Sequence, residues 1–434
     1  MAAENALTQS SNIQKFKISS NQQSKAADLT GGVVDFKYYE SILSNNVTAS
    51  VVIVDSGFKA EGDRVQESIS VLDDLPIRGG ERTDITIEDN YKNQLKFKDG
   101  LYVNRVRDAD SGTQKDVFII DFASKEYFAN EQSRVIARYE GKISEHVNSI
   151  VTNMGGTIEN IDNTSLNYNF IGNDRKPFYT CTWLASKAVP DQDVGTRAGY
   201  VFYQTRDGFN FRSIDKIFDG TPTKKFILNN TGELPQGYTA NVLDYSIDSD
   251  IDLKQNLTLG TYNSRAIYFN PFAMDYYVKE FKYQPDNIGK SGKYFGGDMV
   301  AEEFTQSPTR LMSHVFDVGA MPNGSGNDQL AQWKENSTSP NYDAENTMAQ
   351  SVMRYNQMFS IKTNITLPLD LSIKAGDVVQ CDFPQVSGDN NPEKNQQTGG
   401  IYMVASVCHR VTPNESFSRL ALVRDSFGSK TGFK

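Results

Sequence analysis

The chain has 434 residues, enough for about two to four domains, and 38% of them are hydrophobic and 11% aromatic. Its formal net charge is −10, and its longest basic run is the pair Lys224-Lys225. Tight binding to nucleic acid needs cations that neutralise phosphates, so this composition argues against a nucleic-acid-binding protein. An acidic surface still suits a passage through which DNA slides, because it repels phosphates.

The cysteines and the N-terminus indicate where the protein is made. Cys181, Cys381 and Cys408 lie far apart and form no CxxC pair, which favours folding in a reducing compartment. Residues 1–28 are polar and have no apolar core of signal-peptide type, so we expect a flexible N-terminus. No segment approaches the ~20 apolar residues that cross a bilayer. We therefore expect a soluble protein made in the cytoplasm, without stable membrane insertion.

Strand signals dominate the chain up to residue 121. The apolar run Ala49–Val54 predicts a buried strand, and Asp84–Glu88 alternates as a half-buried strand does. Val117–Phe122 predicts the last strand of this group. We expect residues 29–121 to form a first antiparallel β-barrel of tube type.

The hydrophobic period becomes helical after Ala123. Apolar residues at helical spacing predict an amphipathic helix over about 133–151, and Pro177 suits the first position of a second helix. Asp207-Gly208 between two apolar runs predicts the turn of a β-hairpin. These signals define an α+β domain at residues 122–220.

A polar segment interrupts the rest of the chain. Residues 263–354 are rich in Gly, Asn and Ser and predict a loop-rich excursion, from which a short helix at about 345–359 returns. The alternating strand Ile361–Leu367 follows. We expect a second β-barrel of tube type assembled from residues 221–262 and 355–428. The predicted fold class is mainly β with α+β: two similar antiparallel barrels, an α+β middle domain and the excursion.

One pattern occurs twice, about 300 residues apart. The copies consist of Ile77–Glu81, Gly100–Val103 and Val117–Asp121, and of Ile373–Asp377, Gly400–Val404 and Leu420–Asp425. In each copy a turn glycine precedes one strand, Gly-apolar-Tyr opens the next, and the third ends in Asp. Two copies of a small β-domain present two similar surfaces, which suits symmetry matching better than catalysis.

The histidines offer little chemistry. Of His146, His314 and His409, we expect His146 to lie at the surface of the first helix. Cys408 and His409 are adjacent on one strand and so point to opposite faces, which disfavours a nucleophilic pair. No zinc spacing can be assembled from the histidines and cysteines.

Other motifs for catalysis or cofactors are incomplete. Asp248–Asp252 resembles the start of a calcium loop, but Leu253 and Leu259 replace the Gly and Glu that such a loop needs, so we expect an acidic turn. Gly324-Ser325-Gly326 lies in a polar loop without the strand and helix of a nucleophile elbow. We expect no enzyme activity and no catalytic, cofactor-binding or metal-binding residues. The 54 acidic residues leave a carboxylate pair for glycoside hydrolysis open.

The two tryptophans predict different environments. Trp183 lies on the second helix and is expected in the core. Trp333 lies in the polar excursion, where partner contact and packing against its own loop remain equal alternatives.

The order of these motifs resembles one protein family. Ile373–Val379, Gly400–Val404, Cys408–Val411 and Leu422–Ser426 are similar to the last domain of baseplate central hub proteins of contractile-tailed, T-even-like bacteriophages, which have many relatives in cyanobacterial phages. Segments of the middle and N-terminal regions resemble the same family, namely Phe178–Ala188, Gly199–Gln204, Asp207–Ile214, Tyr39–Leu43 and Val51–Gly57. The resemblance covers most of residues 30–428 and is weakest over 265–350.

The resemblance implies a structural protein of the virion tail baseplate, assembled in the host cytoplasm. It implies a homotrimer in which two barrels per subunit form a pseudo-sixfold ring. That ring would join the tail tube protein hexamer to the central spike protein, contact inner baseplate wedge proteins and let DNA pass during ejection. The excursion would face the spike. The family is not catalytic and implies no cofactor.

Two alternatives come from other classes of protein. A hub of a related contractile injection system, such as type VI secretion, would share the architecture, although such hubs are commonly fused to a spike β-helix. A phage wall-degrading hydrolase would need a carboxylate pair. A module for cell-surface sugars is a weaker option, because it predicts exposed aromatic clusters in loops.

A ring makes two further predictions. Edge strands should pair between neighbouring copies, because open edges invite aggregation. The polar loops 57–64 and 385–397 should protrude from equivalent ends of the two barrels.

Overall fold

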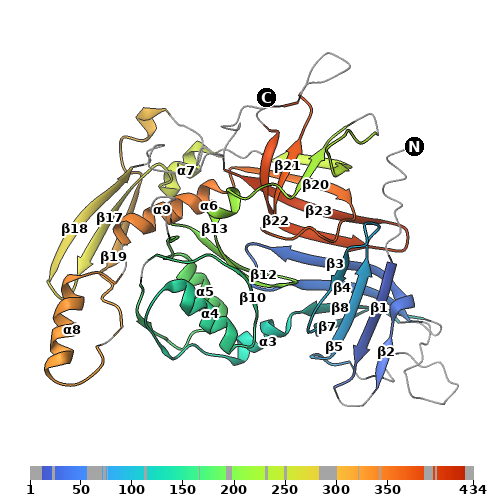
Figure 1. Cartoon of the computed structure of the whole chain (residues 1–434), viewed down its shortest axis with the longest axis horizontal. Coiled ribbons are helices and arrows are strands. Elements are labelled where there is room, and N and C mark those ends of the chain that lie inside the picture. Colours follow the sequence, from blue (N-terminus) through green and yellow to red (C-terminus); the bar gives the residue numbers. More distant parts are fainter. Residues whose placement is uncertain are drawn as a thin grey trace.

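The computed structural model describes most of the chain and shows its parts side by side (Figure 1). The described residues are 12–21, 25–55, 71, 75, 77–111, 115–165, 167–191, 198–229, 233–248, 252–282, 301–320, 322–341, 344–385, 394–395 and 398–425. The protein is mainly β. Two sheet regions lie next to each other, a small α+β unit lies beside the first region and beneath the second, and a separate three-stranded sheet extends to one side.

The first sheet region contains the strands of the N-terminal third of the chain. They are β1 (Asn12–Ser19), β2 (Ala26–Asp28), β3 (Val33–Ser41), β4 (Thr48–Asp55), β5 (Arg82–Glu88), β6 (Gln94–Lys96), β7 (Leu101–Ser111) and β8 (Asp116–Ala123). The alternation that predicted β5 is visible in its burial, since Thr83, Ile85 and Ile87 point into the core. Residues 12–28, expected to be flexible, instead include β1, which pairs antiparallel with β5 and buries Phe16 and Ile18.

The second sheet region contains strands from both sides of the excursion. They are β14 (Lys224–Ile227), β15 (Ala240–Asn241), β16 (Asp244–Asp248), β20 (Ile361–Pro368), β21 (Val378–Asp382), β22 (Gly400–Val411) and β23 (Ser416–Arg424). Together the two regions form one 15-stranded sheet of the described residues. The strands were predicted as two barrels, whereas the described strands form no closed barrel.

The α+β unit follows β8. Its elements are α3 (Lys125–Gln132), β9 (Arg138–Tyr139), α4 (Ile143–Asn153), β10 (Ile158–Ile161), β11 (Phe170–Ile171), α5 (Pro177–Ala185), β12 (Tyr200–Thr205), β13 (Gly208–Ser213) and α6 (Ile214–Phe218). The α5 helix begins at Pro177, as predicted. The hairpin turn consists of Arg206 and Asp207, one residue earlier than predicted, because Gly208 already pairs with Thr205. The rings of Phe178, Phe202 and Phe209 pack together in its core.

The helix predicted over 133–151 begins ten residues later than expected, at Ile143. Gly141 has φ +121°, in the left-handed region that stops a right-handed helix, and the Lys142 backbone N–H donates to the Glu145 carboxylate at the new start. Ile136, an apolar residue that the predicted helix would have included, is 68% exposed.

The excursion is more ordered than its composition predicted. The helix α7 (Leu253–Leu259) precedes the excursion. The described part of the excursion contains β17 (Asn263–Asn270), β18 (Asp275–Lys282), β19 (Arg310–Val315), α8 (Asn327–Thr338) and most of α9 (Ala344–Gln357). The sheet order is β18-β17-β19. The expectation of a loop-rich segment is therefore wrong for this part. The returning helix α9 matches its predicted position.

Candidate assembly surfaces

The two sheet regions contain the same five-stranded unit. In the first unit the strand order is β3-β4-β8-β7-β5, and in the second it is β16-β20-β23-β22-β21. Each order follows the same path along the chain, so the counterparts are β3 and β16, β4 and β20, β5 and β21, β7 and β22, and β8 and β23. The excursion is inserted between the first two strands of the second unit. The predicted repeat is thus present as a repeat of topology.

Equivalent hydrogen bonds show which residues of the two units correspond to each other. The Gly80 N–H donates to the Val103 carbonyl at 2.7 Å, and the Gly376 N–H donates to the Val404 carbonyl at 2.8 Å. The φ angles of the two glycines are +82° and +85°, in the region that favours glycine. In return Val103 donates to Glu81, and Val404 donates to Asp377. A β-bulge follows at the same place, between Val103 and Arg105 and between Val404 and Ser406.

This match corrects the alignment of the later motifs. Val103 pairs with Phe122, and Val404 pairs with Leu422, so Asp121 is the counterpart of Ala421 and not of Asp425. Tyr102 likewise corresponds to Met403 and not to Tyr402. The two Asp residues have different contacts: Asp121 accepts from Arg107 at the surface, whereas Asp425 is buried against Arg354.

A seam between β3 and β22 joins the two units. The six residues 36–41 of β3 pair antiparallel with residues 411–406 of β22. The Arg410 guanidinium donates two hydrogen bonds to the Asp35 carboxylate, at 2.9 and 3.2 Å. On the buried side His409 stacks on Tyr38, with ring centroids 6.3 Å apart. Neither strand carried a sequence signal for this long-range pairing.

Glu40 lies buried at the centre of the seam. Its carboxylate accepts from the Tyr38 hydroxyl at 2.8 Å, from the Arg206 N–H at 3.0 Å and from the Ala375 N–H at 2.9 Å. Burial raises the pKa of Glu40, and these hydrogen bonds oppose the rise. One side chain thus links β3, the β12–β13 turn and the loop before β21. The inward-pointing alternation Phe36, Tyr38, Glu40 could have identified it from the sequence.

The counterparts of the seam strands have open edges. Within the described part of the chain, β16 pairs with β20 alone, and residues 105–111 of β7 pair with β8 alone. Arg105 and Arg107 on β7, and Asp244 and Ser246 on β16, are exposed. These edges were expected in general terms, but only the topology identifies which strands provide them.

The excursion sheet presents an apolar outer face. The exposed side chains on this face and its rim are Phe269 and Phe272 (40% each), Met274 (78%), Tyr276 (65%), Val278 (51%), Leu311 (67%) and Val315 (69%). Trp333 of α8 lies beside them, packed edge to face against Phe272, so it both contacts its own segment and is 36% exposed. An exposed apolar patch of this kind is typical of interaction sites.

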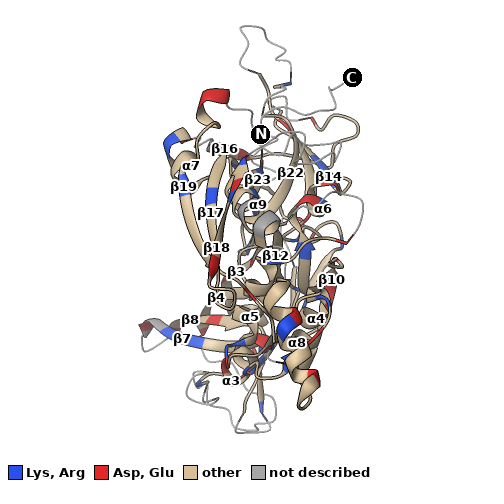
Figure 2. Ribbon diagram, turned by 90° about the vertical axis from the view of Figure 1, so that its left-hand side faces the viewer, with Lys and Arg blue, Asp and Glu red and all other residues tan. Residues whose placement is uncertain are grey.

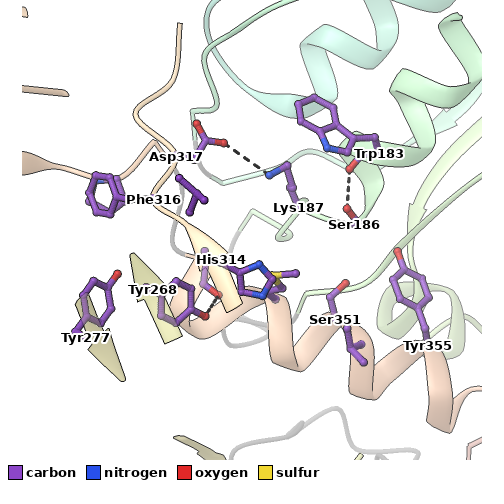
Figure 3. A pocket seen from close by; sticks show the side chains of 15 residues that line it. Trp183, Ser186, Lys187, Tyr268, Tyr277, His314, Phe316, Asp317, Ser351 and Tyr355 are labelled. Carbon is purple, nitrogen blue, oxygen red and sulfur yellow. Dashed lines mark hydrogen bonds and ion pairs between the residues drawn. The ribbon is translucent and has the colours of Figure 1, made fainter. Parts of the chain in front are cut away.

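The opposite face of that sheet lines a cavity of about 430 Å³ (Figure 3). Tyr268 and His314 from the excursion face Trp183, Lys187 and Tyr355 from the rest of the protein. The Lys187 ammonium lies 5.1 Å from the ring centroid of Trp183 and 3.8 Å from Asp317, and burial lowers its pKa.

The two charged groups lining this cavity, Lys187 and Asp317, have structural partners. The Asp317 carboxylate also accepts from the Tyr168 hydroxyl at 2.8 Å, and Lys187 lies over the Tyr168 ring. Burial lowers the pKa of His314, which favours its neutral form. These contacts tie the excursion to the α+β unit, and they do not assemble a nucleophile with a base.

The structure places the other singled-out residues as follows. His146 is buried, contrary to expectation, and its Nε2 lies 2.8 Å from the Tyr168 carbonyl. His409 is buried and Cys408 half-buried, on opposite faces of β22, and Cys181 and Cys381 are buried. Trp183 is partly buried against the α+β core, as predicted.

The calcium-like segment ends in a helix cap. The Asp252 carboxylate accepts from the Gln255 N–H at 3.0 Å at the start of α7. Residues 249–251 lie outside the described residues, as do residues 57–64 and most of 385–397. No group of His, Cys, Asp and Glu that could hold a metal ion occurs among the residues described.

Two general features concern the surface charge and the helices. On the side shown in Figure 2, basic residues of the described chain are interspersed with acidic ones and do not gather on one element. No described helix is both long and apolar enough to span a membrane.

Comparison with known proteins identifies the fold. No protein-family model and no curated protein sequence matches this chain. Among solved structures, the tail protein from Neisseria meningitidis MC58 superposes with a TM-score of 0.51 at 10% identity, covering 96% of this chain and 97% of that one. The 43 kDa tail protein of prophage MuSo2 from Shewanella oneidensis superposes with a TM-score of 0.50 at 9% identity, covering 95% and 98%. The chain therefore has the fold of phage tail proteins, as its resemblance to baseplate hub proteins led us to expect.

Proposed function

We propose that this protein is the central baseplate hub of a contractile phage tail. Three copies form a ring in which six five-stranded units follow one another, so a threefold object presents pseudo-sixfold symmetry. The observation that supports this most directly is the duplicated five-stranded unit, in which Gly80 and Gly376 make equivalent backbone hydrogen bonds. A duplication of this kind lets one trimer contact a tail tube hexamer on one face and a trimeric spike on the other.

We assign the domains of the proposed hub as follows. Residues 29–121 form the first tube-type domain, and residues 221–262 with 355–428 form the second. Residues 122–220 form the α+β domain that packs against them. The excursion, 263–354, faces the central spike, because its sheet exposes apolar side chains such as Leu311 and Val315 that a partner would cover.

The proposed role is structural and not enzymatic. The solved structures of similar fold are described as tail proteins. The net charge of −10 suits a ring through which DNA passes during ejection without being held. The protein would be located in the tail baseplate, in contact with inner wedge proteins, after assembly in the host cytoplasm.

The test is the mass and shape of the purified protein. Light scattering should give about three times 48.5 kDa, and negative-stain images should show a ring with a central hole. The ring should bind tail tube protein, and the mass should not change with dilution to about 1 µM, as for an obligate interface. A monomer at all concentrations, alone and with tube or spike protein, would reject the hub.

A second candidate is the hub of a related contractile injection system, which the same fold and duplication would serve. Binding assays against phage tail tube protein and against the tube protein of a secretion system separate the two. The hydrolase alternative predicts release of peptidoglycan fragments, which we do not expect.

A further inference from the structure

We propose that neighbouring copies of this chain join through two specific edges: β16 of one copy pairs antiparallel with the outer half of β7 of the next. The partner is thus a second copy of the same chain. This inference rests on the proposed hub, and it adds the strands, the register and the residues of the subunit contact.

The first step is that the chain already contains one such contact. The seam pairs the outer edge of β3, in the first unit, with residues 406–411 of β22, in the second unit. It therefore shows which two edges of this five-stranded unit fit each other. In the order of strands across the sheet, one edge is the free side of the first strand. The other is the part of the fourth strand that extends beyond the fifth.

The second step is that each unit has both edges but uses only one of them in the seam. The counterpart of β3 is β16, and the counterpart of β22 residues 406–411 is the outer half of β7. Both are open within the described residues. The pair of edges that fits within one chain is therefore available again between chains.

The register follows from the paired residues. Cys408 faces Tyr39 across the seam. Cys408 corresponds to Arg107, since both lie two residues past the bulge, opposite Arg419 and Ile119 respectively. On the other strand, Tyr39 pairs with Thr48 and Asp248 pairs with Lys362, the equivalent position of the second unit. Position 107 of one copy should therefore lie opposite position 248 of the next.

The chemistry of the edges is compatible with this contact. The outer half of β7 exposes Arg105 and Arg107, and the register places Arg107 opposite position 248, which is an aspartate. Opposite charges on facing edges favour association and select the correct partner. Pairing would also cover two strand edges that otherwise present unpaired backbone groups to other chains.

The direction of the contact matters as much as its residues. Because β16 meets β7, and not another β16, every contact runs from the second unit of one copy to the first unit of the next. Such a head-to-tail contact produces a closed ring or an open filament, whereas a β16–β16 contact would stop at a twofold dimer.

Cysteine cross-linking of the full chain tests the register. Residues that face each other on antiparallel strands have Cα atoms about 4.5–5.5 Å apart, within the range that a disulfide spans. The variant Arg107→Cys/Asp248→Cys should give covalent dimers and trimers on oxidation. The positive control is Tyr39→Cys, which faces the native Cys408 and should close within one chain. The mismatched control Arg107→Cys/Tyr245→Cys should give no ladder.

A second pair protects the test against a variant that fails to fold. The second pair is Asp110→Cys/Ser246→Cys. The corresponding residues of the seam, Arg410 and Lys37, face each other, and both Asp110 and Ser246 are exposed. Circular dichroism and light scattering of each reduced variant verify that it folds and assembles like the unmodified protein.

The outcomes distinguish this inference from the hub itself. A covalent trimer as the largest product of the matched pairs supports it. A trimer by light scattering with no cross-link in either matched pair, while Tyr39→Cys closes, overturns the interface and leaves the hub intact. A ladder that stops at dimers overturns the head-to-tail contact. A monomer under all conditions overturns both proposals.

Discussion

Acid should weaken the seam between the two sheet units through His409. Its ring is buried, lies 2.8 Å from the Ser418 hydroxyl and stacks on Tyr38, and burial lowers its pKa to about 4. In the unfolded chain the pKa is about 6.5. The unfolded state therefore takes up a proton at higher pH than the folded state, and stability is lost as the pH falls from about 6.5 towards 4.

The magnitude follows from the two pKa values. Relative to pH 7.5, the loss from this one group is about 1.4 kcal/mol at pH 5.5 and about 2.5 kcal/mol at pH 4.5. The raised pKa of Glu40 acts in the opposite sense, because a carboxyl that is protonated more easily when folded gains stability as the pH falls. Measuring the wild type alone would therefore mix the two effects.

The assay compares the wild type with His409→Gln, in which this ionisation is removed while Glu40 is retained. Urea unfolding followed by tryptophan fluorescence gives the free energy of unfolding of both proteins at pH 7.5, 5.5 and 4.5. The advantage of the wild type should shrink by about 2.5 kcal/mol across this range. A difference that stays constant within about 0.5 kcal/mol would refute the assigned pKa and the reasoning from burial.

Three other changes test separate parts of the structure. Arg354→Met should lower the free energy of unfolding by about 3–5 kcal/mol in urea titrations, because it leaves the Asp215 and Asp425 carboxylates buried without their cation; a loss below about 1 kcal/mol would contradict this. Gly376→Ala should cost about 2–4 kcal/mol in the same assay, since its Cβ would collide with the buried Tyr203 hydroxyl. The matched Gly80→Ala has a similar positive φ, but its Cβ would make only an ordinary contact with Asn21, so it should cost about 1 kcal/mol; equal losses would argue against the collision. Leu311→Lys/Val315→Lys should leave the trimer mass unchanged and abolish co-purification with the spike protein, and unchanged co-purification would show that the spike docks elsewhere.

Local signals in the sequence were sufficient for many elements. Pro177 predicted the start of α5, Asp207-Gly208 predicted the hairpin turn to within one residue, and alternation predicted β5 and β20, because each signal acts within a few residues. The repeat was also recognisable in the sequence, because a turn that needs a positive φ favours glycine, and the same glycine therefore appears in both copies. For the helix predicted over 133–151, the apolar period was followed through Gly141, although the glycine marked the break.

Contacts between distant residues were decided by the tertiary structure. His146 and Glu40 are buried because of partners more than twenty residues away, Tyr168 in one case and Arg206 and Ala375 in the other. The register of the third repeat strand was misjudged because a slip of four residues keeps the same side of a strand facing inward, so hydrophobic alternation cannot detect it.

The sequence by itself determined that this protein contains one small β-unit twice, with an α+β unit between the copies and a polar excursion inserted into the second copy. Only the tertiary structure decided how the two units meet, because pairing β3 with β22 joins residues some 375 positions apart, and no local pattern encodes such a contact. The same pairing shows which edges remain open, and those edges are the basis for the proposed ring.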